Sequence, residues 1–230
     1  MRLLELFCGS KSIGKVFEKN GFEVVSLDID PKFHPTICCD ILDFDYRKYQ
    51  PGSFDVLWSS PPCQMFSSLR WCLSGRTKKK GITKEQLQND LINLGLPPLL
   101  KTLEIIKYLK PKIWFIENPQ TGLMKDYLDL PYSDCAYCQY NMEYKKPTRI
   151  WNNMNLQLEK CKCKQKHSWT IGKLGTQKYR TEQLYVIPEK LCESIYSQVI
   201  NYLTHFNKSP NLSPELTPYN TELGVIDQLP

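Results

Sequence analysis

The first 27 residues constrain the fold more than any other part of the chain, because they alternate between strand and helix patterns. Residues 2–7 and 22–27 are apolar runs with the length and composition of buried strands. Between them, apolar side chains recur at helical spacing, namely at Ile13, Val16 and Phe17. A helix that links two strands in this way forms a βαβ unit, in which the strands run parallel. The chain therefore begins as an α/β fold.

The same alternation continues downstream. The later predicted elements are strands at 54–58, 112–116 and 144–151 and helices at 83–109 and 189–206. Pro97-Pro98 must break the first of these helices, and a proline is well placed to start its second piece. Strands that alternate with helices favour a Rossmann-like α/β fold, with a mostly parallel sheet covered by helices on both sides. Cofactor and substrate should then bind at the carboxyl ends of the strands.

The size and composition are those of one ordinary globular domain, with 230 residues, 41% of them hydrophobic and 23% charged. We expect a catalytic domain over residues 1–206 and a loosely ordered tail over residues 207–230, which are rich in Asn, Pro, Ser and Thr. No apolar run approaches the roughly 20 residues of a membrane-spanning helix, and the N-terminus lacks a signal-peptide pattern. We therefore expect an intracellular protein, neither secreted nor in a membrane, whose ten cysteines stay reduced. The oligomeric state stays open.

Positive charge is concentrated in two segments. Residues 70–84 carry six Lys or Arg and no acid, and residues 145–180 carry ten against the single Glu159. Together the two segments sum to +15, whereas the whole chain carries +6, so the remainder is acidic. A solvated charged face explains most single runs of this kind. Two such runs in an otherwise acidic chain favour a polyanionic partner such as nucleic acid.

Short segments at the predicted strand ends carry the candidate chemistry. Residues 7–10, Phe-Cys-Gly-Ser, join the first strand to the first helix, where a glycine lets the backbone approach a ligand. Asp28 ends the second strand about 20 residues later, where an acid commonly binds ribose hydroxyls. Asp40-Ile41 is suited to accept a hydrogen bond from an adenine amine and to pack on its ring. Residues 60–64, Ser-Pro-Pro-Cys-Gln, and residues 117–119, Glu-Asn-Pro, place a thiol and a carboxylate at two strand ends, as a cysteine nucleophile and its acid partner require.

These segments resemble the 5-cytosine methyltransferases of nucleic acids, from the start of the chain to Glu117-Asn118-Pro119. The resemblance implies the Rossmann-like class I methyltransferase fold, with S-adenosylmethionine as the cofactor. The cofactor-binding residues that it implies are Phe7, Cys8, Gly9, Asp28, Ile29, Asp40, Ile41 and Pro61. Where the family usually has a second glycine, this chain has Lys11, which shifts the loop geometry and argues against a pyrophosphate cradle.

The resemblance also implies three catalytic residues. Cys63 adds as a thiolate to carbon 6 of cytosine, which turns the ring into an enamine that can attack the methyl sulfonium. Glu117 hydrogen-bonds ring nitrogen 3, and Arg149 contacts the base carbonyl, with a phosphate contact as the alternative for Arg149. The family has Val after Glu-Asn and two alternating arginines, whereas this chain has Pro119 and Arg149 alone. A buried structural thiol and an acid that caps a helix are the plain alternatives for Cys63 and Glu117.

A target base inside a duplex has to be flipped out, at a cost on the order of a few kcal/mol. The candidate nucleic-acid contacts are Gln64, Ser67, Arg70, Arg76, Lys78, Lys79, Lys80 and Lys146. A disordered surface loop is the alternative for Lys78-Lys79-Lys80. The family usually carries a sizeable target-recognition domain, and here only the short basic segment 139–180 is available, so a minimal recognition element or a separate specificity subunit is expected. Such compact versions resemble those of phages and large DNA viruses.

Five residues have the donor types of a zinc site, namely Cys135, Cys138, Cys161, Cys163 and His167. They offer enough ligands for a tetrahedral ion. Because their spacing is irregular, we favour reduced thiols without a metal and keep zinc as the alternative.

Methylation of cytosine carbon 5 in DNA is the leading hypothesis, and RNA is the alternative substrate, because members of the same family act on transfer RNA. Amino-methylation of adenine or cytosine is a second hypothesis. Ser60-Pro61-Pro62 fits the motif of those enzymes, but Cys63 occupies the position of their stacking aromatic ring. The third is a degenerate fold that only binds nucleic acid. Lys11 and Pro119 favour it, whereas Cys63 and Glu117 in the proper order oppose it.

Overall fold

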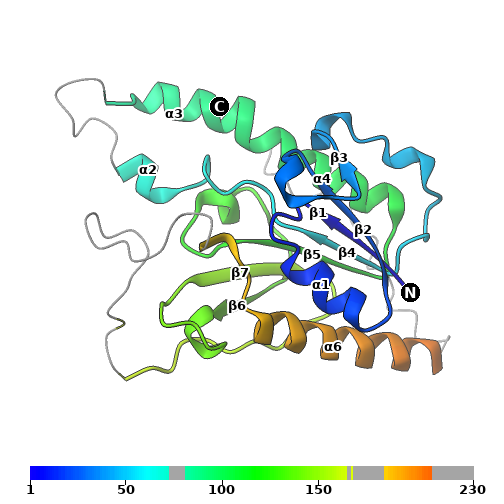
Figure 1. Ribbon diagram of the computed structural model, residues 1–230. Coiled ribbons are helices and arrows are strands. Elements are labelled where there is room, and N and C mark those ends of the chain that lie inside the picture. Colours follow the sequence, from blue (N-terminus) through cyan, green and yellow to red (C-terminus); the bar gives the residue numbers. More distant parts are fainter. Residues whose placement is uncertain (73–80, 165–166, 168–183, 209–230) are drawn as a thin grey trace.

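The computed structural model describes residues 1–72, 81–164, 167 and 184–208, which form one seven-stranded sheet covered by helices (Figure 1). The strands are β1 (Arg2–Leu6), β2 (Glu23–Asp28), β3 (Ile37–Cys38), β4 (Val56–Ser59), β5 (Ile113–Pro119), β6 (Tyr132–Ala136) and β7 (Pro147–Asn152). Their order across the sheet is β3-β2-β1-β4-β5-β7-β6. Strands β1 to β5 run parallel, whereas β7 is antiparallel to both β5 and β6. This architecture confirms the predicted Rossmann-like α/β fold.

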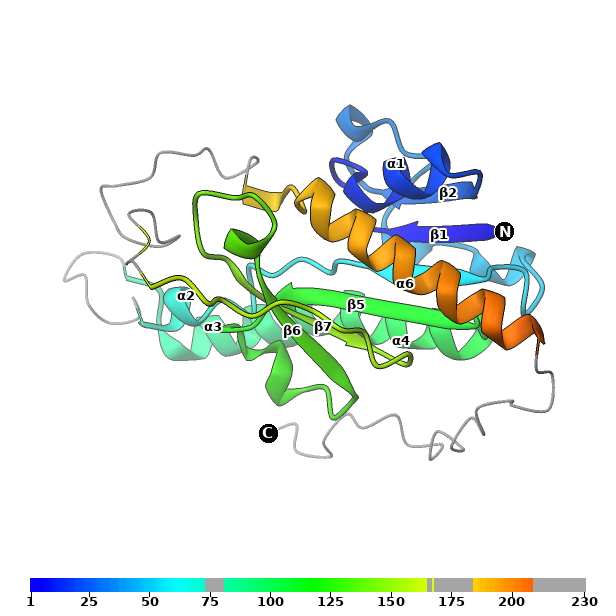
Figure 2. The same cartoon turned by 90° about the horizontal axis from the view of Figure 1, so that it is seen from below.

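Helices lie on both sides of the sheet. They are α1 (Ser12–Lys19), α2 (Ser68–Cys72), α3 (Lys84–Asp90), α4 (Leu96–Leu109) and α6 (Glu189–Lys208). Shorter turns are the π-helical η4 (Leu91–Gly95) and the 3-10 turns η1 (Pro31–Phe33), η2 (Ile41–Asp43), η3 (Tyr46–Lys48), η5 (Leu123–Asp126) and η6 (Tyr137–Gln139). Helices α1 and α6 cover one face of the sheet, and α4 covers the other (Figure 2). In the described part of the chain, no helix has the length and apolar character needed to span a membrane.

Each face of the sheet has its own hydrophobic cluster, and β5 contributes to both. Phe115 belongs to the cluster under α1 and α6, whereas its neighbours Trp114 and Ile116 belong to the cluster under α4. Because side chains alternate between the two faces along a strand, Glu117 lies on the α1 and α6 face and Asn118 on the α4 face. The carboxyl end of β5 therefore directs two consecutive polar side chains, Glu117 and Asn118, to opposite sides of the sheet.

Each predicted strand and helix has a counterpart in the structure. Among the described helices and strands, α2, β3 and β6 were not predicted, and β6 is the longer of these two strands. Its sequence, Tyr-Ser-Asp-Cys-Ala, is short and mostly polar and has little intrinsic preference for a strand. It forms a strand because it pairs with β7 at the edge of the sheet. The late strand predicted at 144–151 is β7. Helix α6 ends at Lys208, two residues beyond the predicted boundary at 206. Residues 209–230, which make up most of the predicted tail, lie outside the described residues.

The helical path from α3 to α4 does not break at Pro97-Pro98, so that part of the prediction was wrong, whereas a proline does stand at the start of the second helix, as predicted. The path widens into the π-helical turn η4 just before Leu96, and proline stands in the first positions of α4. A proline in a regular helix lacks an N–H and collides with the carbonyl four residues earlier. The wider π-helical turn changes that spacing, so the chain continues in the same direction (Figure 1).

A buried carboxyl group joins the first strand to the first helix. Glu5, in the middle of β1, is 2% exposed, and its Oε1 accepts a hydrogen bond from the backbone N–H of Gly14 (3.1 Å). Its Oε2 has no hydrogen-bond partner in the structure. A Cβ at Gly14 would collide with that oxygen, so glycine lets α1 close over the carboxyl group. Burial raises the pKa of Glu5 from its ordinary 4.5 to about 7.

We predict that this carboxyl group makes the free energy of unfolding depend on pH. Since the folded pKa is raised, neutral Glu5 stabilises the fold below pH 4.5, and this contribution is lost as the pH rises through about 7. Glu5→Gln is always neutral and keeps the acceptor for Gly14. From pH 5 to pH 8 its advantage over the wild-type protein should grow by roughly 1–3 kcal/mol in urea unfolding. The exposed carboxyl variant Glu18→Gln should follow the wild-type curve, and a difference that does not change with pH would contradict the assignment.

Candidate active site

The nucleophile loop leaves the sheet at the end of β4 and is held by β5. The Asn118 side chain donates from Nδ2 to the carbonyl of Pro61 (2.8 Å), and both groups are buried. The backbone N–H of Phe66 donates to the carbonyl of Cys63 (3.1 Å), which closes a turn after the thiol. Phe66 itself is fully buried. A buried amide and a buried ring therefore fix the two sides of the loop and leave Cys63 half-buried between them.

Glu117 lies beside this loop because of the pairing between β4 and β5. Ser59 is opposite Ile116 in the parallel register, so the next residues, Ser60 and Glu117, are neighbours, and a hydrogen bond from Ser60 lowers the pKa of Glu117. The Ser60 hydroxyl also accepts from Nε1 of Trp58 (2.9 Å). Glu117 is 8% exposed, and its Oε1 has no hydrogen-bond partner in the structure. A buried acceptor without a partner is costly, and such groups are often explained by a ligand or a catalytic role.

The charges of the site oppose one another. Burial raises the pKa of Cys63, and the negative charge of Glu117 raises it further, whereas Lys146 lowers it. Burial also raises the pKa of Glu117, and Lys146 again opposes the change. Burial thus disfavours the charged forms of both Cys63 and Glu117, and the positive charge of Lys146 opposes this effect.

Lys146 supplies the positive charge that lowers the pKa of both Cys63 and Glu117. Its Nζ donates to the carbonyl of Leu184 (2.8 Å) and lies 4.8 Å from the ring centre of Tyr137. Tyr137 is fully buried in the same hydrophobic cluster as Phe115, so Lys146 is held on the Glu117 face of the sheet. It was predicted as a nucleic-acid contact, whereas its electrostatic effect on Cys63 and Glu117 was not predicted.

Arg149 is not brought together with Cys63 and Glu117. It is opposite Asn118 in the antiparallel register, and residues that are directly opposite share a face. Arg149 therefore lies on the other side of the sheet from Glu117, where it donates from Nε and Nη2 to Asp134 (2.8 and 3.1 Å) and stacks 3.5 Å from the ring centre of Tyr132. Its catalytic role stays a prediction without support from this geometry.

The predicted cofactor residues gather at the carboxyl ends of β1 and β2. The Asp28 carboxylate accepts from the backbone N–H of Gly9 (2.8 Å) and of Asp30 (3.0 Å), which ties the loop after β1 to the end of β2. Phe7 and Gly9 both have positive φ, at 56° and 46°. A Cβ added at Gly9 would meet no atom within 4 Å, so there is open space beside this backbone. Ile29 is 64% exposed at the same edge.

The other predicted cofactor residues differ in exposure. Ile41 is 3% exposed and packs in the core, whereas the next residue, Leu42, is 48% exposed. Asp40 accepts from the backbone N–H of Leu42 (2.9 Å). Cys8 is buried, and burial raises its pKa to about 12. Sequence reasoning missed Leu42, because only the burial of its neighbour in the core reveals which of the two side chains reaches the surface.

The predicted nucleic-acid contacts are dispersed. Arg70 forms an ion pair with Asp90, exposed Gln64 donates from Nε2 to the Tyr185 hydroxyl (3.3 Å), and Ser67 is half-buried. Arg76 and Lys78-Lys79-Lys80 lie outside the described residues.

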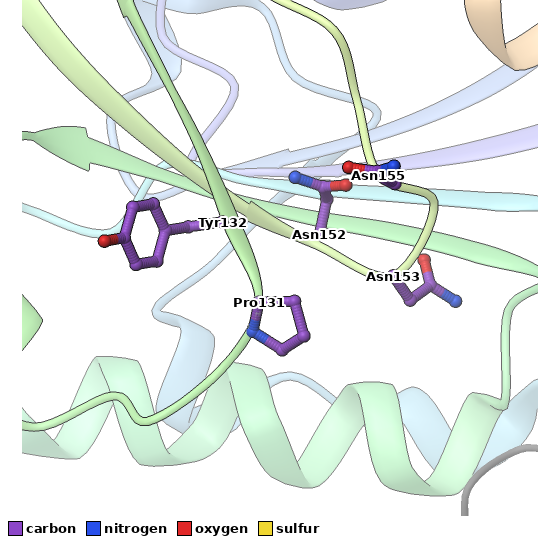
Figure 3. A pocket seen from close by; sticks show the side chains of 5 residues that line it. All are labelled: Pro131, Tyr132, Asn152, Asn153 and Asn155. Atoms are coloured by element: carbon purple, nitrogen blue, oxygen red, sulfur yellow. The ribbon is translucent and has the colours of Figure 1, made fainter.

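A hollow of about 340 Å³ lies at the other end of β6 and β7 and is separate from this site. Figure 3 shows the side chains that line it. They are Pro131, Tyr132, Asn152, Asn153 and Asn155. Asn152 is opposite Phe115, near the amino end of β5, whereas Glu117 and Cys63 lie beyond the carboxyl ends. The hollow therefore does not belong to the candidate active site.

Comparison with known proteins identifies the family. The model of C-5 cytosine-specific DNA methylases matches residues 1–145. The probable DNA (cytosine-5)-methyltransferase of frog virus 3 (isolate Goorha) is 40% identical over 158 residues, which make up 67% of this chain and 71% of that protein. The chain belongs to the C-5 cytosine-specific DNA methylase family.

Solved structures of related proteins are more distant from this methylase. Dnmt2 of S. pombe is 17% identical with a TM-score of 0.40, and the match covers 74% of this chain and 53% of Dnmt2. The Entamoeba histolytica methyltransferase EhMeth is 14% identical with a TM-score of 0.46, and the match covers 70% of this chain and 57% of EhMeth. The chain thus spans about half the length of these structures.

The structure shows how the backbone accommodates two residues, Lys11 and Pro119, that depart from the usual family pattern. Lys11, where a second glycine is usual, adopts φ 55° and ψ 40° directly before α1, a conformation that glycine adopts without strain. Its Nζ donates to the carbonyl of His34. Pro119 ends β5, and Gln120 continues the contact with β7 by donating its backbone N–H to the carbonyl of Pro147 (3.1 Å). Neither departure displaces Gly9 or Glu117 from the site.

We predict that Glu117 and Lys146 change the pKa of Cys63 in opposite directions. Glu117→Gln removes the carboxyl group whose ionised form raises that pKa and should lower it, whereas Lys146→Met removes a positive charge and should raise it. The pKa is measured from the pH dependence of iodoacetamide alkylation, with the Cys63 peptide quantified by mass spectrometry. Arg149→Met is the matched control, because this cation lies on the other face and its loss should leave the profile unchanged. A larger change in Arg149→Met than in Lys146→Met would reverse the assignment.

Proposed function

We propose that this methylase transfers a methyl group from S-adenosylmethionine to carbon 5 of cytosine in DNA. The observation that carries the proposal is the buried Glu117 carboxyl group, with one oxygen lacking a partner, at the strand end next to the loop that carries the half-buried thiol of Cys63. A thiol nucleophile and an acid at neighbouring strand ends match the needs of cytosine, whose carbon 5 is a poor nucleophile until a thiolate adds to carbon 6. Membership of the family supports the same reaction.

The proposed chemistry assigns a distinct task to each side chain. Cys63 loses its proton to water, and the thiolate forms a bond to carbon 6. The electron pair displaced from the double bond between carbons 5 and 6 moves through the ring toward nitrogen 3. Burial raises the pKa of Glu117 and so favours its protonated form, which donates a hydrogen bond to nitrogen 3 and stabilises the developing charge. After methylation, water accepts the proton from carbon 5, the double bond between carbons 5 and 6 forms again, and the bond from carbon 6 to sulfur breaks, which releases the Cys63 thiolate.

Lys146 is proposed to assist Cys63 in place of an arginine. Its ammonium group favours the thiolate, because it lowers the pKa of Cys63. The contacts with Leu184 and Tyr137 hold the side chain in one position, so little entropy is lost when the substrate arrives. Arg149 already satisfies Asp134, and its proposed task is therefore to fix β6 against β7.

The edge of β1 and β2 has the groups that S-adenosylmethionine needs. Each Asp28 oxygen accepts one backbone N–H and retains a lone pair for a ribose hydroxyl. The exposed side chains of Ile29 and Leu42 offer apolar surface to the adenine, and the open space beside Gly9 admits the amino-acid end. When bound, the cofactor supplies the methyl group as an electrophilic sulfonium.

We predict that calorimetric titration detects S-adenosylmethionine binding to the wild-type protein. Ile29→Asp replaces the exposed apolar side chain by a charge and should weaken binding about tenfold or more. Ile82→Asp is the control, since Ile82 is also exposed, at 42%, but lies in the segment before α3. No heat and no thermal shift with the wild-type protein would favour the degenerate, non-enzymatic alternative.

Target recognition is assigned to residues 139–180 within a catalytic domain that spans residues 1–206. The described part of this segment, residues 139–164 and 167, contains Lys145, Lys160, Lys162 and Lys164 in addition to Lys146 and Arg149. These charges suit phosphate contacts. RNA has the same phosphate chemistry and stays the alternative substrate, and a separate specificity subunit stays the alternative source of target recognition.

We predict that Cys63 forms a stable adduct with DNA in which 5-fluorocytosine replaces cytosine. The fluorine at carbon 5 cannot leave as a proton, so the bond between sulfur and carbon 6 persists after methyl transfer. Incubation of a pool of mixed-sequence duplexes with cofactor should yield one protein–DNA species by mass spectrometry. Cys63→Ser should form no adduct and lose turnover by roughly 10⁴-fold or more, whereas Cys72→Ser, which removes another accessible thiol, should react normally. A methylated product without an adduct would favour amino-methylation, and reaction only with the matching RNA pool would change the substrate.

A further inference from the structure

Four side chains with zinc-ligand chemistry meet outside the active site. The ligand atoms of Cys138, Cys161, Cys163 and His167 all lie within 4.8 Å of one another, and Cys161 Sγ lies 3.3 Å from His167 Nε2. Cys135, the fifth residue considered from the sequence, is not in the group. It is 2% exposed and packs in the hydrophobic cluster under α1 and α6.

The donor set and its dimensions suit a closed tetrahedral zinc ion. Zn–S bonds of about 2.3 Å in a tetrahedron place two sulfur atoms roughly 3.8 Å apart, so the four side chains need only small movements to enclose an ion. Three thiolates and one imidazole are a common structural zinc set. They are too soft for magnesium or calcium, which prefer oxygen ligands.

The backbone brings the two ligand-bearing segments together without a metal. Cys138 belongs to η6, which directly follows β6, whereas the other three ligands lie between residues 161 and 167. The backbone N–H of Ala136 donates to the carbonyl of Glu159 (3.1 Å), and the backbone N–H of Glu159 donates to the Tyr140 hydroxyl (2.9 Å). These two bonds flank η6 on both sides, so the approach of the thiols does not depend on their own contacts.

The surroundings of the cluster favour thiolates. Gln139 donates from Nε2 to Cys163 Sγ (3.3 Å) and lies 3.7 Å from Cys138 Sγ, and hydrogen bonds of this kind orient metal ligands from outside. Three thiolates with Zn²⁺ carry a net negative charge. The segment that supplies the ligands alternates them with basic residues, namely Lys160, Lys162 and Lys164.

We infer that Cys138, Cys161, Cys163 and His167 bind one structural zinc ion. The ion cross-links η6 to the segment that leads into the basic residues 168–183, which follow His167 directly in the sequence. Through Tyr137, the first residue of η6, it also stabilises the ring on which Lys146 lies. Because the ligand atoms are close to one another and supplied by two chain segments, zinc binding stabilises the folded state specifically.

The test measures the metal content of the full chain, purified under reducing conditions without added chelator. We expect about one zinc ion per chain, and replacement by Co²⁺ should give the visible absorption of a tetrahedral thiolate site. Cys163→Ser should retain less than about a tenth of the metal, whereas Cys72→Ser, another exposed cysteine outside the cluster, should retain all of it. Wild-type protein without zinc, or Cys163→Ser with wild-type zinc, would overturn the inference.

A second measurement does not depend on whether Cys163→Ser folds. Cys38, Cys72 and Cys163 are all exposed, so alkylation of the zinc-containing wild-type protein should label Cys38 and Cys72 rapidly and Cys163 slowly. Removal of zinc by a chelator should make Cys163 react like the other two and lower the thermal midpoint by several degrees. Equal labelling of all three before and after the chelator would mean that the thiols bind no metal.

Discussion

The buried carboxyl group at the end of β5 is the constraint on which the site depends. Glu117 is enclosed because β5 lies between β4 and β7, and its face of the sheet is covered by the cluster under α1 and α6. Burial raises the pKa of this carboxyl group, so the same packing that stabilises the sheet favours its protonated form. The next residue, Asn118, points to the other face and holds the nucleophile loop through Pro61. Two consecutive residues thus supply the acid and the support of the nucleophile.

The strict alternation of side chains along a strand also decides which cation can act. In the register of β5 and β7, Glu117 is opposite Ile150 and Asn118 is opposite Arg149. A shift of one residue would exchange the two faces, but Arg149 is fixed by its two hydrogen bonds to Asp134 on β6. Lys146 lies directly before β7, on the same side of the sheet as Glu117. There its ammonium group contacts the Tyr137 ring and the carbonyl of Leu184. A motif match at Arg149 therefore identifies the strand but not the active cation.

The sequence was sufficient where the information is local. Periodic apolar residues predicted β1, α1 and α6, and the Ser-Pro-Pro-Cys-Gln and Glu-Asn motifs predicted which strand ends would carry a thiol and an acid. The sequence was not sufficient where contacts between distant segments determine the structure. The polar residues of β6 become a strand only through β7, exposed Leu42 differs from buried Ile41 only in the folded core, and the spacing of Cys138 from Cys161 appears irregular until Ala136 and Glu159 are joined. Each of these depends on contacts between distant residues, which a single sequence does not specify.

The contacts of Lys146 connect the two halves of the proposed reaction. Its Nζ binds the carbonyl of Leu184, and three residues later the backbone N–H of Ile187 donates to the Ser12 hydroxyl (3.2 Å) at the start of α1. Ser12 in turn lies 2.8 Å from the Ser10 hydroxyl in the loop beside Gly9. One short segment therefore bridges the cation beside the nucleophile and the loop proposed to hold the cofactor. Because α6 begins directly after this segment and packs on α1, the closing helix of the fold fixes the distance between the two.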